Sequence, residues 1–269
     1  MTGAPWLRLL ERVGAQGEGF LAYLGGLGYL ALDTVKHTVA GLVTRPRIKA
    51  DETVYQMVRL GVRAVPIIVM VQLFVGMTLA FTLAPVLADY GQLGQLATVI
   101  AKAVFPQLGP LIASIVLTGF AGAAIAAELG TMVVGEEVAA LRTSAIHPIR
   151  FLVVPRVIAC VLMTVALAML ANIIGTAGGG LIAWGVLDID PWQYYHTAIE
   201  ALLVKDVVRG LVKAAVFGLI IVTVSCHEGL GVRGGAGGVG QATTSSVVRS
   251  IFLIIAANCG FTAVFYFVW

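Results

Sequence analysis

Long apolar runs alternate with short clusters of charge along this chain, and the pattern predicts helices that cross a membrane. Four runs of 20 to 31 residues carry no formal charge: 64–88, 103–127, 157–187 and 250–269. A helix needs about 20 residues to cross a hydrocarbon core of about 30 Å. A fifth run, 207–226, is interrupted near its start by Arg209 and Lys213, whose long side chains can reach an interface. The sequence therefore predicts an all-α integral membrane protein with five transmembrane helices.

The first 50 residues follow a different pattern. Four apolar residues are spaced as on one face of a helix, with charged residues between them: Trp6, Leu9, Leu10 and Val13. The apolar run 19–32 is too short to cross a bilayer. We therefore expect an N-terminal amphipathic helix in segment 1–50 that lies in the membrane interface, followed by a transmembrane domain over 51–269. An ordinary amphipathic helix packed on protein is the alternative.

Composition agrees with the membrane prediction and excludes several classes of protein. Hydrophobic residues make up 59% of the chain and charged residues only 12%. The mean hydropathy is +0.97. A soluble domain carries about 25% charged residues, so this chain has too few polar groups to cover a water-facing surface. The net charge of +3 is too small to indicate a nucleic-acid partner.

The distribution of positive charge predicts the orientation in the membrane. With five spans, 13 of the 17 lysine and arginine residues fall on the side that holds the N-terminus. Basic residues collect in the cytoplasmic connections of membrane proteins. We expect the N-terminus in the cytoplasm and the C-terminus outside it.

The connection after the second run becomes acidic and amphipathic. Four apolar residues recur there at helical spacing: Met132, Val133, Val138 and Leu141. Glu136 and Glu137 lie beside this stripe, and Pro148 ends the pattern. A short helix of this kind is either a surface connector or, in a transporter, a lever that a cytoplasmic motor holds.

Small residues mark two further segments. Gly119, Ala123 and Ala127 recur every four positions, which predicts a face that another helix can approach closely. The glycine-rich segment 226–249 contains a formal GxGxxG, but membrane helices flank it instead of a strand. Gln241 and Ala242 stand where a phosphate-binding loop needs Lys and Ser or Thr, which argues against nucleotide binding. We expect a glycine loop here, with a fifth span capped by a threonine at 243 or 244.

No catalytic or metal-binding constellation is visible in the sequence. The four histidines are scattered over distant segments, and the three cysteines form neither a CxxC nor a Cys/His cluster. We therefore predict a protein that is not an enzyme and needs no metal or cofactor. Because charges are nearly absent from the centres of the runs, an ion relay for a secondary transporter is also poorly supported.

Taken together, the polar motifs resemble the MlaE/YrbE family, the permease subunits of MCE-type ABC lipid transporters. The motifs that carry the resemblance are Gln107–Pro110, Ala121–Gly130, Glu136–Leu141, His147–Pro148, Val154–Arg156 and Gly234–Thr244. They occur in order and cover about residues 50–269. The resemblance implies a permease in a bacterial inner membrane that moves phospholipid or another lipid between that membrane and an MCE-domain partner. An ion-coupled secondary transporter and a membrane scaffold without transport activity are the alternatives.

The resemblance also implies partners and residue roles. A cytoplasmic coupling helix at about 131–146, between the second and third spans, would meet a separate ABC ATPase, since the chain has no Walker A motif. A second permease copy in a homodimer, an MCE-domain protein and a small STAS-domain subunit would complete the assembly. The residues expected to contact or couple to the ATPase are Glu128, Glu136, Glu137, Leu141 and Arg142. Those expected to line the lipid path are Leu79, Leu83, Val86, Tyr90 and Gln107.

The chain departs from the family pattern at two places. Many relatives carry an Arg-Glu pair just before Leu-Gly-Pro, whereas this chain has Pro106-Gln107. Relatives often carry Asp in the fifth span where this chain has Asn258. The first departure removes charges that the resemblance places near the lipid headgroup, and the second removes a charge within the membrane.

Overall fold

The computed structural model describes residues 25–30, 32–33, 36 and 50–268. The N-terminal interfacial helix expected around Trp6, Leu9, Leu10 and Val13 lies outside these residues. Within the described part of the chain, regular structure is helical throughout and contains no strand. The prediction of an all-α protein is therefore confirmed.

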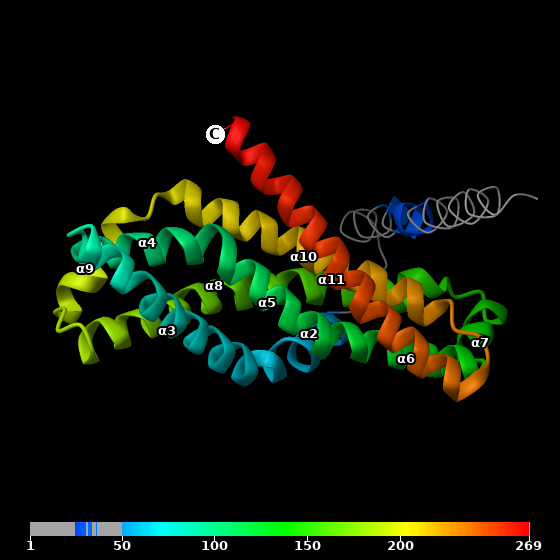
Figure 1. Ribbon diagram of the computed structural model, residues 1–269. Coiled ribbons are helices and arrows are strands. Elements are labelled where there is room, and N and C mark those ends of the chain that lie inside the picture. Colours follow the sequence, from blue (N-terminus) through cyan, green and yellow to red (C-terminus); the bar gives the residue numbers. More distant parts are fainter. Residues whose placement is uncertain (1–24, 31, 34–35, 37–49, 269) are drawn as a thin grey trace, which may run out of the picture.

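Ten α-helices follow one another from residue 50 onward (Figure 1). They are α2 (Ala50–Leu60), α3 (Val65–Asp89), α4 (Leu96–Ala103), α5 (Gly109–Leu117), α6 (Ala123–Val134), α7 (Glu137–Thr143), α8 (Val154–Gly185), α9 (Pro191–Ala201), α10 (Val204–Leu230) and α11 (Gly235–Val268). Short 3₁₀ turns cover Val62–Ala64 and Leu93–Gln95, and π-helical turns cover Val104–Leu108, Thr118–Gly122 and Ile149–Val153.

Five segments of the described chain are long and apolar enough to cross a membrane, as the sequence predicted. They are Asp51–Asp89, Leu93–Val134, Ile149–Gly185, Val204–Leu230 and Gly235–Phe267. The first two are much longer than about 20 residues because each joins several consecutive helices. The spans form an elongated bundle with α7 at one end and α9 at the other (Figure 1). We call these the α7 end and the α9 end.

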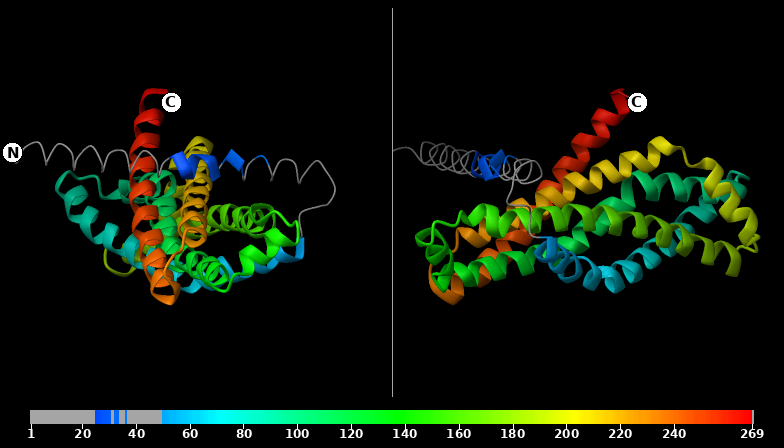
Figure 2. Two further views of the ribbon diagram at one scale, coloured as in Figure 1. Left: turned by 90° about the vertical axis from the view of Figure 1, so that its right-hand side faces the viewer. Right: turned by 180° about the vertical axis from the view of Figure 1, so that it is seen from behind.

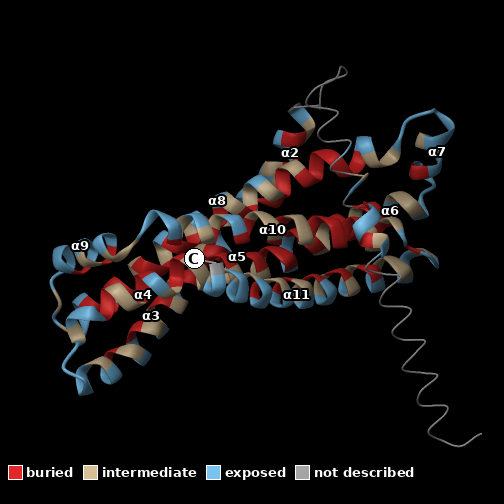
Figure 3. Cartoon of the chain, turned by 90° about the horizontal axis from the view of Figure 1, so that it is seen from above, coloured by how far each residue is buried: buried red, intermediate tan, exposed pale blue. Residues whose placement is uncertain are grey.

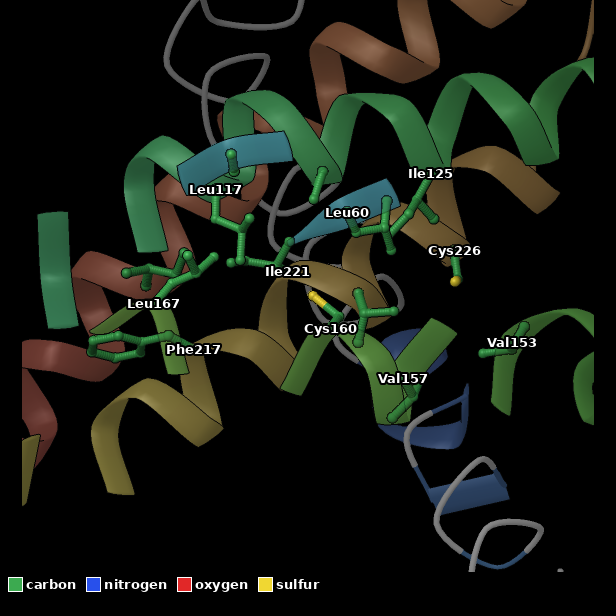
Figure 4. Close-up of a cluster of buried hydrophobic side chains, with 14 of the residues drawn as sticks. Leu60, Leu117, Ile125, Val153, Val157, Cys160, Leu167, Phe217, Ile221 and Cys226 are labelled. Atoms are coloured by element: carbon green, nitrogen blue, oxygen red, sulfur yellow. The ribbon is translucent and has the colours of Figure 1, made fainter. Parts of the chain in front are cut away.

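Two hydrophobic clusters hold the bundle together. The larger joins α2, α5, α6, α8 and α10 and includes Leu117, Cys160, Phe217 and Ile221 (Figure 4). The smaller lies at the α9 end and includes Ile100 and Tyr194. Buried residues concentrate on the facing sides of α5, α8 and α10 (Figure 3). In contrast, only 17% of the most apolar stretch of α11 is buried, and its C-terminal part rises away from the bundle (Figure 2).

Glycines bring α3 and α8 into backbone contact. A Cβ atom added at Gly76 would lie 1.9 Å from the carbonyl oxygen of Gly175. Close approach of this kind is typical of packing between membrane helices. Of the face predicted at Gly119, Ala123 and Ala127, Gly119 is not closely approached by any described residue, because nothing lies within 4 Å of a Cβ added there.

Most of the glycine-rich segment is helical: the predicted loop is present but covers only 231–234, and the predicted threonine cap of the fifth span is wrong. Helix α11 begins at Gly235, directly after the turn residue Gly234, and these two glycines have φ angles of 71° and 88°. The hydroxyl groups of Thr243 and Thr244 donate to carbonyl oxygens four residues earlier inside the helix. The turn into α11 requires glycine at its edge, because a Cβ added at Gly238 would lie 2.0 Å from the carbonyl oxygen of Arg233.

Candidate functional site

The α7 end presents a short helix with an acidic outer surface. Of the expected coupling segment 131–146, the first four residues complete α6, and α7 covers only Glu137–Thr143. Glu136 precedes α7 in the left-handed conformation, with φ 59° and ψ 10°, which turns the chain sharply after Gly135. This turn redirects the backbone so that a separate short helix forms at the end of the bundle.

The side chains of α7 divide into an inner and an outer set. Val138 is buried in the larger cluster, and Leu141 packs against it. Glu136, Glu137 and Arg142 are exposed. The inner residues anchor the helix to the bundle, and the outer charges are accessible to a partner.

Glu128 lies one turn before the end of α6 and joins three parts of the bundle. Its Oε1 atom is 2.9 Å from Nη1 of Arg59 on α2 and 3.0 Å from Nη2 of Arg156 on α8. Arg156 is 4% exposed, and its Nη1 also donates to the carbonyl oxygen of Leu152 at 2.6 Å. Glu128 thus reaches these two arginines instead of standing on the outer surface with the α7 charges.

The expected lipid-path residues of α3 occupy two environments. Leu79 and Leu83 are half-buried and pack against the smaller cluster at the α9 end. Val86 and Tyr90 are exposed. The broadest exposed apolar surface of α3 comes instead from three residues at helical spacing, which are Met70, Phe74 and Phe81. That spacing is visible in the sequence, but several faces of α3 are equally apolar and only packing on α8 distinguishes them.

Gln107 lies in the π-helical turn between α4 and α5 and belongs to a polar cluster. The ammonium group of Lys213 on α10 donates to Gln107 Oε1, and also to Asn258 Oδ1 and Thr262 Oγ1 on α11, both at 3.2 Å. The prediction that Lys213 reaches an interface is wrong: its side chain points into protein and is 2% exposed. Burial of a lysine requires hydrogen-bond partners, and helices distant in the sequence supply them.

A cavity of about 460 Å³ adjoins this cluster. Its walls come from the π-helical turn, the first turns of α10 and the last turns of α11: Pro106, Gln107, Lys205, Arg209, Lys213, Thr262, Phe265 and Tyr266. The cavity therefore combines positive charge, neutral oxygens and aromatic rings at one place in the bundle.

Comparison with known proteins places the chain in a family. The family described as Permease MlaE matches residues 53–264, which include both the α7 end and the polar cluster. The chain belongs to the MlaE permease family. A probable ABC transporter permease of Rickettsia felis is 35% identical over 260 residues, covering 97% of this chain and 98% of the relative.

Two further relatives come from other groups of organisms. The protein TRIGALACTOSYLDIACYLGLYCEROL 1 of Arabidopsis thaliana chloroplasts is 35% identical over 240 residues, covering 88% of this chain and 68% of the relative. The intermembrane phospholipid transport system permease MlaE of Haemophilus influenzae is 27% identical over 263 residues, covering 97% and 98%.

This MlaE-family permease has a helix at the α9 end that the sequence analysis missed. Asp190 caps α9, since its Oδ2 atom accepts the N–H of Gln193 at 3.0 Å, and Pro191 occupies the first turn. The Asp190-Pro191 pair is the sequence signal from which this helix could have been predicted.

The side chain of Tyr194, on α9, is buried and donates to the carbonyl oxygen of Thr176 at 3.2 Å. Burial raises the pKa of the Tyr194 phenol above its ordinary value, so the group remains a neutral donor.

A second cavity, of about 500 Å³, lies between α7 and the last turn of α10. Val138, Arg142, Ile146 and Leu230 are among its lining residues. The permease therefore offers both a charged surface and a recess at the α7 end.

Proposed function

We propose that this chain is the membrane subunit of an ABC transporter that moves phospholipid, or a related lipid, between the inner membrane and an MCE-domain partner. The observations that carry the proposal are the exposed apolar face of α3, at Met70, Phe74 and Phe81, and the separate cavity with polar lining at Gln107. An apolar face suits acyl chains and a polar cavity suits a headgroup. The name of the Haemophilus relative supports phospholipid as the cargo.

The lipid path in this proposal is lined by the predicted residues together with those that the structure adds. Val86 and Tyr90 are exposed near the α9 end of α3, and helical spacing places them on the side opposite Met70, Phe74 and Phe81. Leu79 and Leu83 share the side of Val86 and Tyr90 and pack against the smaller cluster. Gln107 marks the polar end of the path, next to Lys213.

ATP hydrolysis takes place in a separate ATPase subunit that contacts α7. The exposed charges of Glu136, Glu137 and Arg142 form the contact surface, and Leu141 anchors it to the bundle. ATP can shift the permease only if the ATPase binds its two states with different affinity. Movement of α7 would then reach α2 and α8 through Glu128 and its two arginines.

The assembly contains a second copy of the permease. Helix α11 is the candidate interface, since its apolar surface is largely uncovered within one chain. In this proposal the α9 end is periplasmic and meets the MCE-domain protein, and the C-terminus is on the same side of the membrane. The α7 end would be cytoplasmic, where the STAS-domain subunit would join the ATPase.

The test uses the whole complex in vesicles. Replacing Glu136 and Glu137 with lysine and Leu141 with alanine should lower ATPase co-purification and ATP-driven lipid transfer about tenfold, equivalent to about 1.4 kcal/mol. Glu200→Lys on the exposed surface of α9, at the opposite end of the bundle, is the matched control for the ATPase contact and should leave ATPase co-purification unchanged.

Three results would contradict the proposal. Unchanged ATPase binding and transfer in the triple variant would exclude α7 as the contact. Transfer that persists without the ATPase but stops when the ion gradient collapses would favour an ion-coupled transporter. No lipid movement by the complete complex would favour a scaffold.

A further inference from the structure

Gln72 is a buried residue of α3 whose side-chain amide has no hydrogen-bond partner among the described residues. It is 1% exposed, and both its Nε2 and its Oε1 atom are unpaired. Turning the amide group over supplies no partner, because the donor and the acceptor are both unpaired. The two threonines of α3 differ, since Thr78 and Thr82 donate to carbonyl oxygens four residues earlier. Gln72 is therefore an exception to the rule that buried polar groups are hydrogen-bonded.

The amide of Gln72 is directed at a glycine of α8. A Cβ atom added at Gly175 would lie 2.9 Å from Gln72 Nε2 and 3.2 Å from Gln72 Cγ. The carbonyl oxygen of Gly175 faces Gly76, one turn further along α3, where an added Cβ would lie 1.9 Å from it. The side chain of Gln72 is thus packed closely on α8 but contacts no group there that bonds to its amide.

Asn172, on α8, carries a second unpaired amide atom. It precedes Gly175 by three residues, which places the two on one side of the helix and about 4.5 Å apart along its axis. Asn172 is 0% exposed, and its Nδ2 donates to the carbonyl oxygen of Phe105 at 3.4 Å. Its Oδ1 has no partner in the described part of the chain. The unpaired donor of Gln72 and the unpaired acceptor of Asn172 are therefore complementary and close to the same turns of α8.

The contact between α3 and α8 contains few side chains that would resist a change of position. A Cβ added at Gly178 would lie 2.3 Å from the carbonyl oxygen of Leu73, so backbones meet here as they do at Gly76. The carbonyl oxygen that accepts from Asn172 belongs to the π-helical turn Val104–Leu108. Such turns are frequent at functional sites. A shift of α3 relative to α8 therefore displaces no large side chain at these glycines.

The unpaired amides destabilise the described state relative to one in which they are paired. Burial removes water from an amide, and only a hydrogen bond offsets that cost. A bond between Gln72 and Asn172 would offset it for both groups at once. The balance between two states of a protein depends on differences of this kind.

We propose that the permease has a second state in which α3 has moved relative to α8 and Gln72 Nε2 donates to Asn172 Oδ1. The inference rests on the proposed function, since lipid transfer proceeds through this second state. Gln72 is then a positioning residue for α3, whose exposed face includes Met70 and Phe74. Movement into the second state shifts that apolar face, and Gln72 influences transfer without touching lipid.

The experiment compares thermal unfolding of the complete complex in detergent, without nucleotide, with ATP-driven lipid transfer by the same complex in vesicles. Gln72→Met keeps the length of the side chain and removes the amide. Its melting temperature should rise by a few degrees, because the described state loses an unpaired polar group. Its lipid transfer should fall about tenfold, because the second state loses its bond. A residue with a merely structural role would not raise stability and lower transfer together.

Thr164→Val on α8 is the matched control. It removes a buried hydroxyl that already donates to the carbonyl oxygen of Cys160, so it should not raise the melting temperature and should leave transfer unchanged. Asn172→Ala tests the partner. Alone it should lower transfer about tenfold, but added to Gln72→Met it should lower transfer by less than about twofold further, because the bond is already absent.

A melting temperature of Gln72→Met at or below that of wild type would overturn the inference, as would transfer by this variant at the wild-type rate. Losses that multiply in the double variant would exclude Asn172 as the partner and would also overturn it. The proposed function is judged by wild type alone, because a wild-type complex that moves no lipid with ATP contradicts it. In that case the melting temperature of Gln72→Met still tests whether its amide is unpaired.

Discussion

At the scale of single residues, Glu136 at the α7 end has an unusual backbone conformation. A residue with a side chain adopts the left-handed conformation at a cost of about 1–2 kcal/mol, whereas glycine adopts it freely. Glu136 nevertheless occupies it, with φ 59°. Backbone strain of this kind is common at functional sites, and Glu136 lies on the exposed surface proposed to contact the ATPase.

Glu136→Gly should therefore raise the melting temperature of the purified permease by a few degrees, because it removes about 1 kcal/mol of strain. ATPase co-purification should fall in the same variant because the charge is lost. Glu137→Gly is the matched control: it places glycine in the first turn of α7 and should lower stability. Equal destabilisation by both variants, measured by thermal unfolding in detergent, would contradict this account.

At the scale of elements, contact between α3 and α8 depends on glycine. The buried face of α3 consists of Ile68, Gln72, Gly76, Ala80 and Ala84. This face is narrow and lets the two backbones meet at Gly175. The opposite face is left uncovered, and this arrangement makes the large apolar side chains of α3 available to a lipid.

Gly76→Ala should destabilise the permease by several kcal/mol, since the new Cβ atom would lie 1.9 Å from a backbone oxygen that cannot move independently. Gly119→Ala is the control, because nothing lies within 4 Å of its Cβ position and alanine favours a helix. Expression level and thermal stability in detergent measure the difference. Similar stability of the two variants would show that α3 and α8 are further apart than described.

At the scale of the whole molecule, the charged groups at the α7 end connect the helices that would have to move together. Glu128 joins α2, α6 and α8 at a distance from the exposed α7 surface. Glu228 on α10 pairs with Arg249 on α11 at the same end. These ion pairs would link the helices near the proposed ATPase contact to one another.

Glu128→Gln should leave ATPase binding intact but reduce the lipid transferred per ATP hydrolysed by about tenfold, because α6 would no longer pull on α2 and α8. It should also lower stability, since the buried Arg156 loses a partner. Asp51→Asn, which neutralises an exposed carboxylate on α2, is the control. If the variant is less stable but transfers the same amount of lipid per ATP hydrolysed, Glu128 has only a structural role.

The sequence by itself determined the fold class, the five spans and the acidic character of the α7 segment. These features depend on the length of apolar runs and on local charge, which are properties of consecutive residues. Local signals failed at the start of α11, where most of a glycine-rich segment is helical.

Only the tertiary structure decided which faces are buried and which charges meet. Gln107, Lys213 and Asn258 come from three separate helices, and Arg59, Glu128 and Arg156 from three others. In an apolar helix every face looks alike in sequence, so the contacts of its few polar residues depend on how the helices pack. That packing brings Lys205, Arg209 and Lys213 to one cavity and leaves one face of α3 exposed.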